Sequence, residues 1–320
     1  MNVAERGFGA SGCAGARLDL VETGFLAIYK SLSSGYTVGM PMSSASLDPV
    51  PGTAITPRDV DFELDPSRAR DWLDGSPEKT VFPNALSIMF PPGERFFIAS
   101  VLANRDRILD PKLKAEVKAF CRQEAYHTRE HVAYNRALNS FVDADELERD
   151  LTQHLEWVKK TLPADGPLMA TCALEHFTAI MAHELLLDPA YQRNAEPAYA
   201  RLWTWHALEE CEHKAVAFDV FRATVSGRNR EWRRGLVMWL TTVTFLRFIA
   251  KHCFALMRAQ RLAHKPGSWA KLLWYVFGYP GMMRRIVPAY LKYYSPRFHP
   301  NDLDDSNALA RTRALVAAWQ

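Results

Sequence analysis

The chain has 320 residues, of which 48% are hydrophobic and 23% charged, and its formal net charge is +3. These values are ordinary for a soluble globular protein, and so small a net charge argues against nucleic acid as a partner. Its five cysteines are scattered and lack metal-binding spacing, and the N-terminus shows no secretory signal, so we expect a cytoplasmic protein with reduced thiols. The longest uncharged apolar run, 235–246, is shorter than the roughly 20 residues that span a bilayer.

The expected elements begin after a segment rich in Gly, Ser, Ala and Pro. Residues 1–60 are expected to be a poorly ordered N-terminal extension, with a short amphipathic helix at 18–32. Beyond it, apolar residues recur at a spacing of 3.6, which predicts core helices at 84–104, 111–138, 166–187 and 195–225. Asp110 as a cap and Pro111 in the first turn predict the start of the second helix.

Further helices are predicted in the C-terminal third, over 231–262 and 268–294. The Gly-Tyr-Pro-Gly segment at 278–281 is expected to interrupt the last of them. The sequence therefore predicts an all-α protein, a ferritin-like four-helix bundle over 61–226 with additional C-terminal helices over 227–320 packed on it.

Acidic and imidazole side chains lie among the apolar residues of all four predicted core helices. His206, Glu210 and His213 are four and three residues apart, so they share one helical face. That face continues through Leu202 and Val220, which are typical core residues. Carboxylates and imidazoles on a core-facing stripe are costly to desolvate unless they are paired or bind a metal.

One pattern occurs twice: a lone Glu, followed on the next helix by Glu-x-x-His. The first copy has 30 residues between its Glu positions and the second has 35. A four-helix bundle with one Glu from each of two helices, and Glu-x-x-His from each of the others, is the di-iron or di-manganese carboxylate site. The predicted metal ligands of the two copies are Glu94, Glu124, His127, Glu175, Glu210 and His213.

His206 has two interpretations. It lies one turn before Glu210, so it is either a third imidazole ligand or a histidine that hydrogen-bonds a ligand carboxylate. We predict ligation. Glu209 and Glu212 do not fall on the ligand face, and they are expected to point outward or to support the ligands. His131 is expected to support a ligand or to be plain core.

The chemical types of the predicted ligands indicate which metal ions the site would bind. Carboxylates can bridge two ions and neutralise their charge, and an imidazole three residues later completes the shell of each ion from the same face. A set of carboxylates and imidazoles without thiolate suits iron or manganese better than structural zinc. We expect two Fe ions, with Mn or a mixed Fe/Mn pair as alternatives.

Four quoted stretches carry a family resemblance: FPNALSIMFPPGERFF, QEAYHTREHVAYN, ALEHFTAI and LWTWHALEECEHKAVAFDV. Over about residues 56–290 they resemble the bacterial family of predicted metal-dependent hydrolases, which belongs among the ferritin-like proteins. The His-x-x-x-Glu-x-x-His order is also similar to the di-iron arylamine N-oxygenases, although little outside these motifs is, so their substrate is not carried over. The resemblance implies Glu94, Glu124, His127, Glu175, His206, Glu210 and His213 as ligands.

Three functions agree with such a centre. The first is an O2-activating oxidoreductase acting on an apolar small molecule; because the sequence contains no flavin, nicotinamide or iron–sulfur motif, it needs an external electron donor. The alternative is a metal-dependent hydrolase that uses a metal-activated water. The third is a ferroxidase or iron-binding protein. We predict the first.

Residues 232–262 raise a separate question, because their apolar residues surround nearly the whole helix before Arg247 and Lys251 appear. Packing across the bundle is the simplest interpretation. Formation of a homodimer and peripheral contact with a membrane surface through Trp, Arg and Lys are the others.

Overall fold

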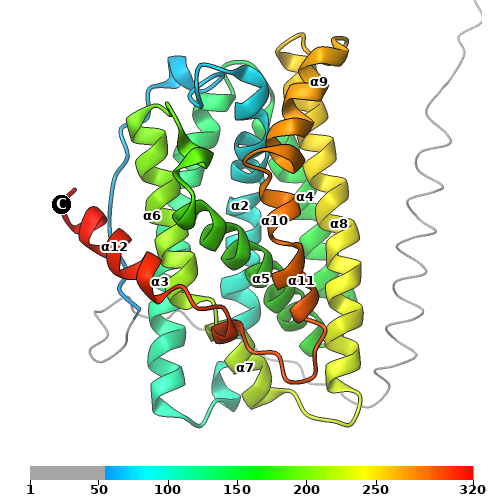
Figure 1. Ribbon diagram of the computed structural model, residues 1–320. Helices are drawn as coiled ribbons and strands as arrows, with labels where there is room; N and C mark the ends of the chain where they lie inside the picture. Colours follow the sequence, from blue (N-terminus) through cyan, green and yellow to red (C-terminus); the bar gives the residue numbers. More distant parts are fainter. Residues whose placement is uncertain (1–54, 320) are drawn as a thin grey trace, which may run out of the picture.

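The computed structural model describes residues 55–319 and confirms the all-α prediction (Figure 1). Within this range no strand forms, and Leu73 and Ala195 make an isolated antiparallel bridge. The expected extension at 1–60, except for its last six residues, lies outside the described residues, as does its short helix at 18–32.

Four helices form the central part of the molecule: α2 (Pro77–Leu102), α3 (Pro111–Leu138), α5 (Asp165–Leu187) and α6 (Pro197–His213). Helix α2 packs along α3, and α5 packs along α6. Contacts of α2 with α5 and of α3 with α6 close these two pairs into a ring. The four helices that carry the predicted ligands therefore surround a common interior.

The observed bounds follow local capping. Asp110 accepts a hydrogen bond from the Lys112 backbone N–H at 2.9 Å, and Pro111 is the first helical residue, as predicted. Helix α2 begins at Pro77 rather than at residue 84, because Ser76 caps it. Prolines usually interrupt a helix, so the predicted helix started directly after Pro83. Burial of nearly the whole first half of α2 carries the helix past it.

Two further prolines, Pro91 and Pro92, lie just before Glu94 inside α2. Proline has no N–H, so Pro91 leaves the carbonyl of Ser87 without its helical donor. The Asn135 side-chain amide donates to that carbonyl at 3.1 Å. The proline pair thus ties α2 to α3 at the turn before a predicted ligand.

The prediction of a single helix over 195–225 is wrong in one respect. The chain forms two helices there, α6 and α7 (Val216–Thr224). The interruption comes directly after His213, at Lys214. The buried Lys214 ammonium donates to the Asp305 carboxylate at 2.8 Å and to the Leu303 carbonyl at 2.6 Å. The chain therefore turns where a C-terminal segment meets the ring.

Helix α4 (Ala144–Thr161), which packs on α2, α3 and α5, was not predicted from the sequence. Asp143 caps it by accepting from the Glu146 N–H at 2.8 Å. Its buried residues recur every three or four positions, as Leu151, Leu155 and Val158 show. The many charged residues between them concealed this narrow apolar stripe.

The C-terminal third adds one long helix, α8 (Arg230–Ala259), which packs on α2 and α5, and several short elements. These are α9 (Pro266–Leu273), a π-helical turn η4 (Trp274–Gly278), α10 (Met282–Arg285), α11 (Val287–Lys292) and α12 (Ser306–Ala317). Short 3-10 turns are η1 (Pro66–Arg68), η2 (Arg105–Arg107), η3 (Pro189–Gln192) and η5 (Pro300–Asp302). Helix α12 lies beside α6 (Figure 1).

The predicted interruption at 278–281 is confirmed, since the chain is not α-helical between η4 and α10. Gly281 has a φ of +76°, and a Cβ there would lie 2.4 Å from the Gly278 carbonyl oxygen. Only glycine fits this turn. By length and composition, α8 is the one helix among the described residues that could cross a bilayer, and 39% of its most apolar window is buried inside the protein.

Candidate metal centre

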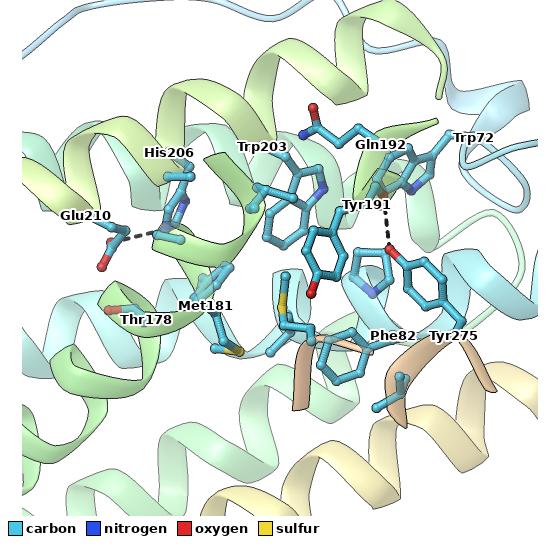
Figure 2. A pocket seen from close by; sticks show the side chains of 18 residues that line it. Trp72, Phe82, Thr178, Met181, Tyr191, Gln192, Trp203, His206, Glu210 and Tyr275 are labelled. Atoms are coloured by element: carbon cyan, nitrogen blue, oxygen red, sulfur yellow. Dashed lines mark hydrogen bonds and ion pairs between the residues drawn. The ribbon is translucent and has the colours of Figure 1, made fainter. Parts of the chain in front are cut away.

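All seven side chains predicted as ligands meet inside the ring of α2, α3, α5 and α6, and none is more than 3% exposed. Figure 2 shows two of them, His206 and Glu210, neighbouring each other on α6; His206 Nε2 lies 3.1 Å from Glu210 Oε1. The structure thus brings together every residue that the twofold sequence pattern selected. Their role as ligands stays a prediction.

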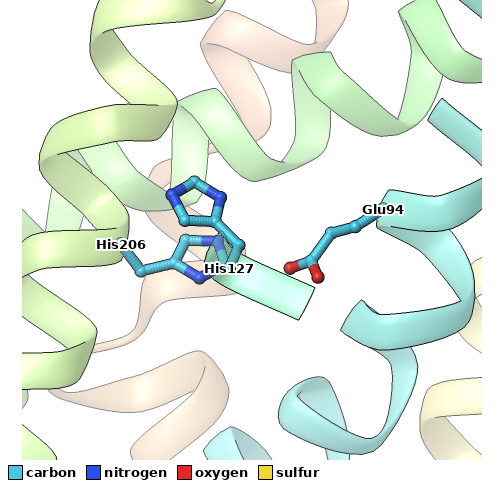
Figure 3. A group of neighbouring side chains, drawn as sticks. All are labelled: Glu94, His127 and His206. Carbon is cyan, nitrogen blue, oxygen red and sulfur yellow. The ribbon is translucent and has the colours of Figure 1, made fainter. Parts of the chain in front are cut away.

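One group of donors consists of Glu94, His127 and His206. One donor atom from each lies within 4.8 Å of the others. Figure 3 shows the Glu94 carboxylate reaching from α2 toward the two imidazoles. The rings of His127 and His206 are stacked with centroids 4.3 Å apart, so both present nitrogens on the same side of the interior.

A second group consists of Glu124, Glu175 and His213, again with donor atoms within 4.8 Å of one another. His213 Nε2 lies 3.0 Å from Glu124 Oε1 and 3.5 Å from Glu175 Oε2. This group draws one residue from each of α3, α5 and α6. It contains one imidazole, whereas the first group contains two.

Glu210 and Glu124 connect the two groups. Together with His127 they form a third set within the same 4.8 Å limit. Glu210 Oε1 lies 3.4 Å from His127 Nδ1, while its Oε2 lies 3.6 Å from His213 Nε2. A carboxylate with one oxygen toward each group is what a bridge between two cations requires.

The far side of each imidazole is held by a hydrogen bond. His127 Nε2 donates to Glu209 Oε2 at 3.2 Å, so that its Nδ1 faces the centre. His213 Nδ1 donates to Gln123 Oε1 at 2.9 Å, so that its Nε2 faces the centre. Such partners set the tautomer and the orientation of a metal-binding histidine. Glu209 therefore supports a predicted ligand, as one of its two interpretations expected.

His206 is held in the same way by a chain of polar groups. Its Nδ1 lies 2.7 Å from His131 Nε2, and His131 Nδ1 lies 2.9 Å from Ser87 Oγ. This leaves His206 Nε2 facing Glu210. His131 thus supports a predicted ligand, and α2 and α3 together orient an imidazole that belongs to α6.

The inward atoms have no hydrogen-bond partners among the described residues. Both carboxylate oxygens of Glu94, Glu124 and Glu175 are buried without a hydrogen bond. The same holds for His127 Nδ1, His206 Nε2 and His213 Nε2, which lie near carboxylates but not in hydrogen-bonding orientation. Buried polar atoms left unsatisfied are rare because each is costly. Convergent, unpaired anionic and imidazole donors fit a pair of divalent cations.

The pKa values reflect this crowding of charge. Burial, followed by the nearby Glu124 charge, raises the pKa of Glu94 and of Glu175 well above the usual range. Burial opposes ionisation of Glu210 too, but the surrounding imidazoles, His213 above all, hold its pKa well below that range. Burial disfavours the charged form of His127, yet the neighbouring carboxylates of Glu209 and Glu210 raise its pKa to about 10. Without cations, the centre must therefore retain protons.

The segment at residues 55–62 covers the outer side of this arrangement, which the sequence reading did not foresee. Arg58 binds Glu212 through both terminal nitrogens, at 2.9 and 2.8 Å, and Glu209 at 3.2 Å. Glu212 also accepts from Gln123 at 3.2 Å. Arg58 and Gln123 carried no sequence signal, because their roles arise only when segments far apart in the chain meet.

A cavity of about 680 Å³ reaches the centre, with His206 and Glu210 in its wall. Apolar side chains form most of the lining, including Phe82 and Phe90 from α2 and Met181 from α5. Figure 2 shows His206 and Glu210 on one side of this cavity and Trp72 and Tyr275 on the other. The centre therefore adjoins a mainly apolar cavity, the kind of lining that small-molecule sites have.

Comparison with known families matches residues 56–304 to the model of a family described as predicted metal-dependent hydrolase. No curated protein and no solved structure matches the chain. The match spans the four ring helices, α4 and the C-terminal elements up to η5.

Proposed function

Because the chain belongs to the family of predicted metal-dependent hydrolases, we propose that it is a dinuclear metal enzyme that hydrolyses an apolar small molecule. The observation that carries this proposal is the set of seven buried donors whose inward atoms lack partners while the outward imidazole nitrogens are hydrogen-bonded. The family description favours hydrolysis over the oxidoreductase expected from the sequence.

The residues that would hold the cations divide into the two groups described above. Glu94, His127 and His206 would hold one ion, and Glu175 and His213 the other, with Glu124 and Glu210 shared. Carboxylates and imidazoles without thiolate favour iron, with manganese or a mixed pair as alternatives. Bound divalent cations lower the pKa of water and polarise a carbonyl or phosphoryl oxygen.

The cavity residues determine what reaches the centre. Phe90 lies against His206 with ring centroids 4.6 Å apart, so it excludes water from that side of the centre. Tyr191 is 2% exposed, and its hydroxyl has no hydrogen-bond partner among the described residues. Figure 2 shows this hydroxyl directed into the cavity toward Phe82. A buried, unpaired hydroxyl in an apolar pocket can orient a substrate that carries an acceptor such as an ester carbonyl.

The test combines metal analysis with an assay in the absence of O2. We expect two metal ions per chain, and cleavage of aryl esters of medium-length fatty acids that a chelator abolishes and added metal restores. Glu175→Ala should lose both metal and activity. Metal-free active protein, or metal-loaded protein inactive on esters, amides and phosphoesters alike, would contradict the proposal.

Tyr191 has a matched control in Tyr275, which also lines the cavity but already donates its hydroxyl to the Tyr191 carbonyl at 3.1 Å. Tyr191→Phe should raise KM about 2- to 12-fold, the loss expected for one hydrogen bond, with little change in kcat. Tyr275→Phe should leave KM unchanged. Equal effects of the two substitutions would remove Tyr191 from substrate recognition.

The second candidate is O2-dependent oxidation of an apolar substrate, with electrons from an external donor. Four carboxylates and three imidazoles in one buried centre beside an apolar cavity favour it. The same protein separates the two candidates. Substrate consumption that needs O2 and a reductant supports oxidation, whereas cleavage under nitrogen supports hydrolysis. Growth of a mineral core of many irons per chain would instead support a ferroxidase.

A further inference from the structure

Charge is divided unevenly along the chain. Between residues 232 and 301 there are twelve Lys and Arg residues and no Asp or Glu, although the whole chain has 39 basic and 36 acidic residues. The rest of the chain therefore carries nine more acidic than basic residues. Seven of the twelve cations are exposed and pair with no described carboxylate: Arg247, Arg258, Arg261, Lys265, Arg284, Lys292 and Arg297. Among residues 55–319, this region therefore offers positive charge that no acidic group neutralises.

The same region exposes large apolar side chains. On α8 they recur on one stripe, with Trp239 56% and Phe254 52% exposed. On the π-helical turn, Trp274 is 67% and Phe277 52% exposed. The set, which we call the C-terminal apolar face, is Trp232, Trp239, Val243, Leu246, Phe254, Leu273, Trp274, Phe277, Tyr279, Val287, Leu291 and Tyr294. Contiguous exposed apolar residues mark interaction sites.

Two elements of this face, η4 and α8, also line a cavity with their inner sides. In η4, Tyr275 and Val276 line the cavity that reaches His206, while their neighbours Trp274 and Phe277 are exposed. In α8, residues of the inner face such as Phe245 line a second apolar cavity of about 1070 Å³. The two cavities share wall residues of α2 and α5, including Phe90 and Met181 of the first cavity. At η4 and α8, a single layer of chain thus separates the C-terminal apolar face from the cavities.

We propose that the C-terminal apolar face docks on a lipid bilayer that contains anionic lipids. Tryptophan and tyrosine favour the interface between water and the acyl chains, and lysine and arginine favour anionic headgroups. A protein partner would need carboxylates to match these cations, whereas anionic lipid supplies negative charge over the entire face. Docking would place the thin layer over the cavities against the source of an apolar substrate, a consequence that rests on the proposed function.

The face docks on the bilayer rather than crossing it. Helix α8 packs on α2 and α5 through Val237, Phe245 and Phe248, which are at most 6% exposed, and a spanning helix would have to leave these contacts. It also carries Arg247 and Lys251 in its middle, where a bilayer would oppose charge.

Flotation of the purified full chain with unilamellar vesicles tests the proposal. The protein should float with vesicles of phosphatidylcholine and 30% phosphatidylglycerol, and bind phosphatidylcholine alone at least tenfold more weakly. Trp274→Ser combined with Phe277→Ser should lower the partition coefficient at least tenfold on both. Arg247→Gln combined with Lys292→Gln should lower it about 25-fold on anionic vesicles only, about fivefold for each cation.

Matched controls are Leu109→Ser and Leu315→Ser, since these apolar side chains are 87% and 52% exposed but lie outside the face. They should bind vesicles as the unmodified chain does. Circular dichroism and metal content, measured on every variant, exclude unfolding as the cause of lost binding. Vesicle binding requires no turnover, so it tests docking even if the proposed hydrolysis fails.

Three results would overturn the proposal. The first is a folded chain that floats with neither vesicle, or whose face variants float unchanged. The second is a dimer in light scattering that Trp274→Ser with Phe277→Ser converts to a monomer while flotation is absent, which would assign the face to a second copy of the chain. The third is resistance to alkaline carbonate extraction, which would indicate insertion of α8.

Discussion

The metal centre and the C-terminal apolar face are opposite departures from the usual arrangement of a globular protein. Inside the ring, seven ionisable side chains are buried where apolar ones would be more stable. On α8 and η4, tryptophan and phenylalanine are exposed where polar residues would be more soluble. Each departure is costly for the isolated chain, and under the two proposals each cost would be relieved by binding, of cations in one case and of a lipid surface in the other.

Buried carboxylates within α3 also differ in whether burial leaves them without hydrogen bonds. Glu130 lies on the same helix as Glu124 and is 2% exposed, but it accepts from Arg129 at 2.7 Å and from the Phe62 N–H at 3.2 Å. Glu124 has no such partners. Of these two buried carboxylates on one helix, the protein itself supplies hydrogen bonds to Glu130. Glu124 is left open for a bound cation, as the proposed function requires.

The largest expected effect is on the free energy of unfolding, where one substitution should stabilise the metal-free protein and destabilise the metal-bound protein. At pH 8, Glu175→Gln should stabilise the metal-free protein, by roughly 1–3 kcal/mol, because it removes a buried acid whose oxygens accept no hydrogen bond. In excess metal the same substitution should destabilise the protein. A cation at 1,000 times its Kd contributes about 4 kcal/mol to stability, and the variant loses this contribution. Urea unfolding with chelator and with metal measures both free energies.

Glu130→Gln is the control for that reversal. Because Arg129 and Phe62 already complete its carboxylate, this variant should change the free energy of unfolding by the same amount with and without metal. If Glu175→Gln behaves like Glu130→Gln, the centre is a structural network and does not bind metal.

A smaller effect is expected from the residues that hold the imidazoles. Glu209→Gln should weaken metal binding about 10- to 100-fold, since Glu209 orients His127 from behind. Glu212→Gln should cost less, because Glu212 touches the same Arg58 but reaches a predicted ligand, His213, only through Gln123. Competition with a coloured chelator gives both affinities. Equal losses would mean that Arg58, and not His127, transmits the effect.

A buried histidine outside the centre gives a pH-dependent effect. Burial lowers the pKa of His252, on the inner side of α8, to about 4. Between pH 4 and 6.5 the unfolded chain therefore binds more protons than the folded one, and stability falls as the pH falls, by about 1.4 kcal/mol per pH unit. His252→Gln should reduce the slope of unfolding free energy against pH in that window. The exposed His264→Gln should leave it unchanged.

The smallest effect is expected on the C-terminal apolar face. Trp239→Ser should change the free energy of unfolding by no more than about 0.5 kcal/mol, because the side chain is 56% exposed. Phe248→Ala, on the inner side of the same helix and 2% exposed, should cost about 3–5 kcal/mol. A large loss in Trp239→Ser, seen in urea unfolding without vesicles, would show that this stripe is core and not a docking surface.

Some expectations from the sequence failed for identifiable reasons. Helix α4 was missed because charged residues surround its apolar stripe, and the start of α2 was misplaced because Pro83 usually interrupts a helix. The break after His213 lies where Lys214 contacts Asp305, which is 91 residues away in the chain. Local patterns cannot report contacts of that kind.

The sequence by itself determined the all-α class and the choice of the seven clustered donors, because a helical period of 3.6 converts spacing directly into position on a face. It could not determine how those donors divide into two groups, which residues support each imidazole, or which side of α8 faces outward. The tertiary structure alone decided these features, because they depend on contacts between helices, and such contacts have no periodic signal within any one of them.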